Sequence, residues 1–252
     1  MKLTIVGCAG SYPGPDSAAS CYLVEAEQDG RVWRLVLDMG NGSLGQLHRY
    51  IDPRGIDAVA LSHLHPDHCI DLVSLVVLAK YHPQGPYDRV KVIAPRGGEE
   101  YLAAAGGPGG EPPLDALTFG VWEDEPEQQL GPFSIRVAPV KHPVPAFAMR
   151  IQAGDSVLVY SGDTGPTEAL DELAADADVF LCEASFVESA VNPPDLHLTG
   201  KEAGECALKA DVGRLLITHI PDWTDADEVE SDLRAVYDRA YVMVKPGDSF
   251  EF

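Results

Sequence analysis

The chain has 252 residues, of which 45% are hydrophobic and 23% charged, values that are ordinary for a globular protein and exclude disordered and fibrous classes. Its 40 acidic residues outnumber 18 basic ones, and the formal net charge of -22 argues against a broad nucleic-acid-binding face, because such a surface would repel a polyanion. A metal cation or a small ligand is compatible with this charge.

Strand and helix patterns alternate along the whole chain. Short runs rich in Val, Ile and Leu predict strands at 3–6, 32–37, 57–61, 90–93, 133–138, 156–160, 178–182, 214–218 and 241–244. Helical patterns fall at 43–51, 70–81, 97–105, 166–175, 199–209 and 226–238. The stretch 106–132 is rich in Gly, Pro and acidic residues and is expected to be a surface loop or a connection between the two halves. The alternation predicts an α/β fold with buried strands, in a single domain covering residues 1–252.

Two parts of the sequence echo each other. Val36-Leu37-Asp38-Met39-Gly40 and Val159-Tyr160-Ser161-Gly162-Asp163 each place an acidic residue beside glycine at the end of a strand. Later in each half a strand ends in a hydroxyl residue and a histidine, at Ser62-His63 and Thr218-His219. Two pseudo-symmetric halves facing each other would bring these four strand ends to one edge of the fold.

The cysteines and the start of the chain favour a cytoplasmic protein without membrane association. The five cysteines are widely spread and include no C-x-x-C pair, so no disulfide framework is expected and a reducing compartment is favoured. No apolar run reaches the roughly 18–20 residues of a membrane span. The run after Met1 ends at Gly7, which is typical of a first strand rather than a signal peptide.

The segment Ser62-His63-Leu64-His65-Pro66-Asp67-His68 carries three histidines and an aspartate directly after a predicted strand. His63 and His65 can face one ion at the strand-to-loop turn, whereas Asp67 and His68 on the following turn can face a second. Neutral imidazole together with carboxylate suits zinc, manganese or iron. The alternative is a polar loop whose histidines bond only to backbone, but three histidines at this spacing favour a metal site.

Further candidate ligands are His142, Asp163 and His219, which fall where strand ends are expected. Two metals about 3.5–4 Å apart need a bridging carboxylate, and Asp163 suits this position because Gly162 allows close approach. Taken by itself, Asp163 is more typical of a turn residue.

The motif His63-x-His65-x-Asp67-His68, followed by His142, Asp163 and His219, resembles the metallo-β-lactamase superfamily of binuclear hydrolases. The resemblance covers nearly the whole chain and implies a four-layer αββα sandwich. It further implies that one metal is held by His63, His65 and His142 and the other by Asp67, His68 and His219, with Asp163 bridging them.

Three other residues resemble supporting groups of this superfamily. Asp38 resembles the acidic strand end beneath the metals, where it would orient a ligand. Glu183, in the run Phe180 to Ser185, and His197, before Leu198-Thr199, resemble motifs of ribonuclease Z-like phosphodiesterases, in which the histidine contacts the phosphoryl group and the glutamate polarises it. The alternatives are a helix-start or surface acid for Glu183 and a position in the N-cap region of the 199–209 helix for His197.

The substrate expected from this resemblance is a small phosphodiester. Transfer-RNA-processing members carry a long basic arm between the positions of His142 and Asp163, whereas here only a hairpin is predicted, with strands at 147–151 and 157–160 around a Gly154-Asp155 turn. The missing arm and the acidic charge disfavour tRNA, which needs several phosphate contacts from Lys and Arg. Arm-less cyclic-nucleotide phosphodiesterases are similar, which points to 3′,5′-cyclic nucleotides, cAMP first, with 5′-monophosphates as products.

The resemblance also implies the chemistry. Two divalent metals, zinc first and manganese or iron as alternatives, would activate a water between them as the nucleophile. Asp67, Glu183 and His197 are the candidate catalytic residues, and His197 held by Glu183 would be either the acid for the leaving oxygen or a phosphate binder. Competing functions are a tRNA 3′-end endonuclease, a thioester hydrolase of the glyoxalase II type and an inactive metal-binding scaffold. The broadly apolar helix 70–81 is either a core helix or the interface of a homodimer.

Overall fold

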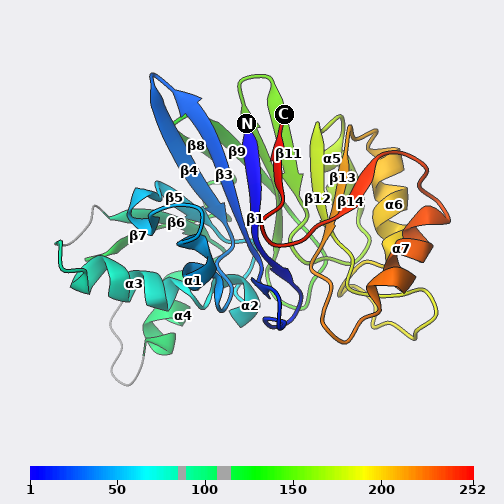
Figure 1. The fold of residues 1–252 in the computed structure, drawn as a ribbon, viewed down its shortest axis with the longest axis horizontal. Coiled ribbons are helices and arrows are strands. Elements are labelled where there is room, and N and C mark those ends of the chain that lie inside the picture. The colour runs from blue at the N-terminus through cyan, green and yellow to red at the C-terminus, as the bar shows by residue number, and fades with distance from the viewer. Residues whose placement is uncertain (85–88, 107–114) are drawn as a thin grey trace.

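The computed structural model describes residues 1–84, 89–106 and 115–252. It contains two β-sheets that lie face to face, with helices on their outer sides (Figure 1). The order of the first sheet is β15 (Ser249–Glu251), β1 (Lys2–Ala9), β3 (Cys21–Gln28), β4 (Arg31–Leu37), β5 (Ala58–Ala60), β6 (Val90–Ala94) and β7 (Leu117–Val121), and β2 (Ala18–Ala19) pairs with β1. The order of the second is β14 (Tyr241–Met243), β13 (Leu215–Thr218), β12 (Val179–Glu183), β11 (Ser156–Tyr160), β10 (Phe147–Ala153), β9 (Phe133–Pro139) and β8 (Glu127–Leu130).

Each sheet has its own set of helices. With the first sheet lie α1 (Ser43–Leu47), α2 (Pro66–Cys69), α3 (Leu72–Tyr81) and α4 (Gly98–Ala105), together with a short 3₁₀ helix at Pro53–Gly55. With the second lie α5 (Glu168–Ala174), α6 (Gly200–Lys209) and α7 (Ala226–Arg234). The resulting order helix, sheet, sheet, helix confirms the predicted αββα sandwich.

Three layers of apolar side chains hold these layers together, one between the sheets and one beneath each helical layer. Strand β12 shows how one strand serves two layers. Val179 and Leu181 point into the core between the sheets, whereas Phe180 and Cys182 point toward α5 and α6. Because both faces of such a strand are covered, its sequence is a continuous apolar run rather than an alternating one.

Parallel pairing in each half sets the position of the strand ends. Strands β4, β5, β6 and β7 pair in parallel, as do β11, β12, β13 and β14. The carboxyl ends of these two groups therefore lie along one edge of the sandwich, which is the lower edge in Figure 1, where α2 also lies.

The nine strands and six helices expected from the sequence are all present, with small differences at their ends. The predicted hairpin is also confirmed, since β10 pairs with β11 up to Ala153 and Ser156 around a turn in which Gly154 has a φ of 61°. Of the two expectations for 106–132, the connection between halves is confirmed, because β7 belongs to the first sheet and β8 to the second, whereas a plain surface loop is wrong where it can be compared; residues 107–114 fall outside the described part of the chain. These strands form because they pair with β6 and β9, although their own composition is mixed.

Helix α3 is half-buried rather than enclosed in a core. Leu72, Leu75 and Ala79 pack against the first sheet, while Val77 and Tyr81 are exposed. A homodimer through the outer side of this helix stays a prediction. All five cysteines are free thiols, and none of the described helices is both long and apolar enough to cross a membrane.

Candidate metal centre

The candidate ligands lie along the edge formed by the strand ends. His63 follows β5 through Leu61 and Ser62, Asp163 follows β11, and His219 comes directly after β13. His219 has a φ of 59° and Asp38, at the end of β4, a φ of 55°, so the backbone turns sharply at both points. Non-glycine residues rarely adopt this conformation and concentrate at functional sites when they do.

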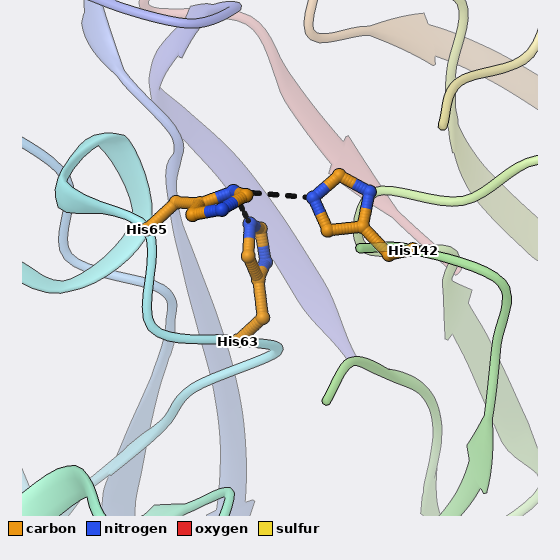
Figure 2. A group of neighbouring side chains, drawn as sticks. All are labelled: His63, His65 and His142. Carbon is orange, nitrogen blue, oxygen red and sulfur yellow. Dashed lines mark hydrogen bonds between the residues drawn. The ribbon is translucent and has the colours of Figure 1, made fainter. Parts of the chain in front are cut away.

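His63, His65 and His142 form one cluster of side chains (Figure 2). Nε2 of His63 lies 3.0 Å from Nδ1 of His65, and Nε2 of His142 lies 3.1 Å from the same Nδ1. His65 is the residue before α2, whereas His142 comes from the connection between β9 and β10. The three imidazoles thus converge from two distant parts of the chain on one point.

Asp67, His68, Asp163 and His219 form a second cluster, and all four residues are buried. Nε2 of His68 lies 3.2 Å from Oδ1 of Asp163, and Nε2 of His219 lies 3.1 Å from its Oδ2. Oδ2 of Asp67 is 3.5 Å from Nε2 of His68. Nε2 of His63 is 3.7 Å from Oδ2 of Asp163, so this carboxylate lies between the two clusters.

The buried atoms of the second cluster fit a bound cation. Among the described residues, His68 Nε2, Asp163 Oδ1 and His219 Nε2 are buried atoms without a partner of hydrogen-bond geometry. Leaving such atoms unpaired costs roughly 1–3 kcal/mol each, and native proteins rarely do so. Imidazole nitrogens and carboxylate oxygens are the donors that zinc and similar ions accept, so these residues make a metal-binding His/Asp cluster.

Outer contacts engage Nδ1 of His63, His142 and His219, whereas His65 faces the centre with its own Nδ1. Nδ1 of His142 donates to the carbonyl of Leu196 at 3.0 Å, and Nδ1 of His219 lies 2.9 Å from Oγ of Ser20. Nδ1 of His63 lies 3.0 Å from Oγ of Ser62. With Nδ1 engaged in this way, the lone pair on Nε2 is directed at the ion, as is usual for metal-bound histidine.

Asp38 is the buried carboxylate on which several of these contacts converge. Its Oδ1 accepts from the backbone N–H of Ser62 at 2.6 Å, and its Oδ2 accepts from Nδ1 of His68, Oγ of Ser62 and Oη of Tyr160, each at 2.7 Å. Asp38 is therefore positioned as the sequence predicted, since it is hydrogen-bonded to Nδ1 of the candidate ligand His68.

The charges of the site follow from its burial and its pairs. Burial lowers the pKa values of His63, His65 and His142, which keeps these imidazoles neutral as ligands must be. Burial alone would raise the pKa of Asp163, but the adjacent His219 and His68 hold it well below its ordinary value. In the same way, His68 outweighs burial and lowers the pKa of Asp67 to about 2.

His197 and Glu183 form a hydrogen-bonded pair beside the second cluster. Nδ1 of His197 donates to Oε1 of Glu183 at 2.8 Å and lies 4.0 Å from Oδ2 of Asp163. Glu183 is fully buried at the end of β12 and also accepts from the backbone N–H groups of Thr164 at 2.8 Å and Ser185 at 3.2 Å. Although burial favours the neutral imidazole, Glu183 raises the pKa of His197 to about 9.

The alternative reading fails for Glu183, whereas His197 does lie in the short stretch before the N-cap of α6. Glu183 is neither a surface acid nor a helix start, because it is the last residue of a buried strand. The N-cap of α6 is Thr199, whose Oγ1 accepts from the N–H of Glu202, so His197 lies two residues before the cap. Its ring instead lies 5.6 Å from that of His142 and 5.7 Å from that of His219, centre to centre.

Sequence reasoning missed several supporting residues, namely Ser20, Tyr160, Thr164, Ser185 and the carbonyl of Leu196. Ser62 was noticed only as part of the hydroxyl-histidine echo. Nothing in the local sequence around Ser20 marks it, because its partner His219 is 199 residues away.

Comparisons with known proteins agree with this architecture. Residues 33–220 match the family model described as "Beta-lactamase superfamily domain". Uncharacterized proteins of Mycobacterium leprae and Mycobacterium tuberculosis are 44% identical over 100% of this chain and 88% and 92% of their own lengths. The probable metallo-hydrolase YhfI of Bacillus subtilis is 29% identical over the full length of both chains, and a ribonuclease Z of Haloferax volcanii is 25% identical over 100% of this chain and 95% of its own.

Solved structures show the same fold. The crystal structure of YhfI from Bacillus subtilis superposes with a TM-score of 0.86 at 25% identity, covering 100% of this chain and 99% of that one. The short form of human tRNase Z gives a TM-score of 0.74 at 16% identity, with coverages of 100% and 99%. Zn²⁺-bound PqqB from Methylobacterium extorquens gives 0.75 at 17% identity over the whole of both chains.

Proposed function

The chain belongs to the β-lactamase superfamily and is a metal-dependent hydrolase, and from this premise we propose that it is a phosphodiesterase for small phosphodiesters, 3′,5′-cyclic nucleotides first and cAMP foremost among them. The observation that carries the proposal is the His197–Glu183 pair beside Asp163. Cleaving a phosphodiester requires a proton for the departing oxygen, and this pair places a proton-bearing imidazole against the metal cluster.

The proposed assignment uses all seven ligands. One cation would be held by His63, His65 and His142 and the other by Asp67, His68 and His219, with Asp163 between them. When bound there, two divalent ions, zinc first, would activate a water and neutralise the charge that grows on the phosphoryl oxygens. Asp67 would act through its cation rather than as a separate acid.

Neighbouring side chains hold the imidazole of His197 in position for its proposed role. Glu183 accepts from Nδ1 of His197, which leaves Nε2 to donate to the leaving oxygen or to bind the phosphoryl group. The N–H groups of Thr164 and Ser185 fix the Glu183 carboxylate, and the ring of Phe186 meets that of His197 edge to face at 5.1 Å. An imidazole held on both sides in this way needs little reorganisation during the reaction.

Two features support a small substrate. The β10–β11 connection is a tight hairpin closed by Gly154 and Asp155, so no basic arm extends from this place. The net charge of -22 opposes a long polyanion, whereas a small anion can approach a locally cationic centre. The identity to a ribonuclease Z of Haloferax volcanii supports the competing proposal of tRNA 3′-end cleavage, which the same experiment tests.

The experiment measures the metal content of the purified protein and its turnover of cAMP, cGMP, bis(p-nitrophenyl) phosphate, a precursor tRNA and a glutathione thioester. We expect two metals per chain and conversion of cAMP to 5′-AMP. Precursor tRNA cleavage without cyclic-nucleotide turnover would replace the proposal by an endonuclease, and thioester cleavage alone by a glyoxalase II-type activity. Two metals without any turnover would identify a metal-binding scaffold.

A matched pair of variants tests the role of His197. Exchange His197→Ala should lower kcat by about 10²- to 10⁴-fold while both metals are retained, because His197 is proposed as the acid and not as a ligand. The control is His48→Ala, which removes an exposed imidazole at the end of α1. Loss of a metal in His197→Ala would reassign the residue as a ligand.

A further inference from the structure

Two exposed aromatic side chains lie next to the metal-bearing edge and are not used by the mechanism above. Tyr12 is 40% exposed and Trp223 is 65% exposed. Their ring centres are 5.1 Å apart and their planes are inclined at 42°. Large aromatic side chains that stay exposed together on a folded protein commonly mark a binding surface.

The turn that carries Tyr12 is fixed to the metal ligand His219. The backbone N–H of His219 donates to the carbonyl of Cys8 at 3.0 Å, and that of Gly10 donates to the carbonyl of Ile220 at 3.2 Å. A side chain at position 10 would approach the carbonyl oxygen of His219 to 2.5 Å, so only glycine permits this contact. In Figure 1 the turn after β1 (dark blue) and the segment after β13 (orange) lie at the same lower edge.

The segment that carries Trp223 is fixed to the His197–Glu183 pair as well. Oγ1 of Thr224 donates to the carbonyl of Ser185 at 3.1 Å, and the N–H of Ser185 donates to Glu183. Trp223 is only four residues after His219, and four residues of chain span at most about 14 Å. The two segments that carry these rings are therefore both anchored to the backbone around His219 and Ser185, beside the metal cluster and the proposed acid.

We propose that Tyr12 and Trp223 form a stacking platform for the nucleobase of the substrate, an inference that rests on the proposed nucleotide phosphodiesterase activity. A cyclic nucleotide whose phosphate lies at the metal cluster must place its base to one side, and these two rings, inclined to each other at 42°, offer apolar ring faces for it there. Stacking needs no positive charge, which suits a chain with 18 basic residues against 40 acidic ones. Because a purine has the larger face, the platform favours purine over pyrimidine nucleotides.

The test compares a substrate that has a base with one that lacks it. The substrates are cAMP and the 3′,5′-cyclic phosphate of 1-deoxyribose, and the variants are Tyr12→Ala, Trp223→Ala and Trp223→Phe. The control is Tyr81→Ala, which removes an exposed aromatic ring from α3. We expect KM for cAMP to rise about 5- to 150-fold in Trp223→Ala, the range that base stacking spans, with kcat and the base-free substrate unchanged. Trp223→Phe should keep most of the affinity for cAMP.

A binding measurement separates this inference from the proposed activity. AMP should quench the fluorescence of the metal-loaded wild-type protein and should no longer quench it in Trp223→Ala, where Trp33 and Trp122 remain. If wild-type protein hydrolyses cAMP but Trp223→Ala keeps the wild-type KM, the platform is refuted while the activity stands. If no phosphodiester is cleaved, quenching by AMP still supports the platform and its absence refutes it.

Two further outcomes would also overturn the platform. Equal losses for both substrates would show that the rings act only by supporting His219. A change in oligomeric state in either alanine variant, without a change in KM, would identify the rings as a subunit interface.

Discussion

Replacing Asp38 tests whether this carboxylate orients the candidate metal ligand His68 through its hydrogen bond to Nδ1. The exchange Asp38→Asn keeps the size of the side chain but replaces one acceptor oxygen by an NH₂ group. Four donors converge on the carboxylate, at 2.6 Å from the Ser62 N–H and at 2.7 Å from Ser62 Oγ, Tyr160 Oη and His68 Nδ1. An amide cannot accept from all four, so at least one buried donor faces another donor.

The expected magnitude follows from that geometry. Losing the acceptor of a metal-bound histidine typically costs 10- to 100-fold in metal affinity, so Asp38→Asn should weaken the cation held by His68 about that much. The cation near His142 should be less affected, because Nδ1 of His142 donates to the carbonyl of Leu196 and not to Asp38. Asp38→Ala leaves all four donors unpaired and should destabilise the fold by about 3–5 kcal/mol, as the loss of one partner of a buried charged pair does.

The assay titrates each metal-free variant with zinc against a chelating dye and measures urea unfolding in parallel. Tyr160→Phe removes one donor of the four and should keep near-wild-type metal affinity while losing about 1 kcal/mol of stability. Asp238→Asn, an exposed aspartate, serves as the control. Two tight sites of unchanged affinity in Asp38→Asn would refute the reasoning that Asp38 orients His68.

Three further predictions follow from the same contacts. Removing the metals with chelator should lower the thermal midpoint, and added zinc should restore it, because chelation leaves His68 Nε2, Asp163 Oδ1 and His219 Nε2 buried and unpaired; an unchanged midpoint would contradict this. Asp163→Asn should weaken both metal sites, whereas His65→Ala should remove one metal and leave the other, which metal analysis can distinguish. Gly40→Ala should destabilise the protein strongly in urea unfolding, since its Cβ would approach the Asp67 carbonyl to 1.9 Å, whereas Gly45→Ala in α1 meets nothing within 4 Å and should gain about 0.4–1 kcal/mol.

The strands at the centre of each sheet were predictable because they are buried on both faces and their sequences are therefore continuous apolar runs. Strand β13 reads Leu-Leu-Ile-Thr and is buried at every position, so its sequence alone indicates a covered strand. Edge strand β8 reads Glu-Gln-Gln-Leu, which has no such signal, and forms because Glu127 to Leu130 pair with Arg136 to Phe133 of β9. Pairing with β9 makes this segment a strand, and local composition alone could not predict it.

The residues of the candidate metal centre likewise include some that the sequence predicts and others that only the fold reveals. His63, His65, Asp67 and His68 were recognisable because they are close in sequence and follow a buried strand, and the spacing itself carries the chemistry. The groups that orient them come from elsewhere in the chain, since Tyr160 contacts Asp38 across 122 positions and Ser20 contacts His219 across 199. A single serine or tyrosine has no distinctive spacing, so only the folded structure shows these roles.

The acidity of the chain and the choice of substrate are linked through the metal centre. Asp38, Asp67, Asp163 and Glu183 are buried at one edge, and without cations they would repel a phosphate. If the proposed function is right, attraction of the phosphate would come from bound metal, while the proposed aromatic surface would hold the rest of the nucleotide without any basic residue. An enzyme built in this way depends little on long-range charge attraction. Its KM for a cyclic nucleotide should accordingly change little between low and moderate salt, in contrast to the steep salt dependence of a protein that binds tRNA through several phosphates.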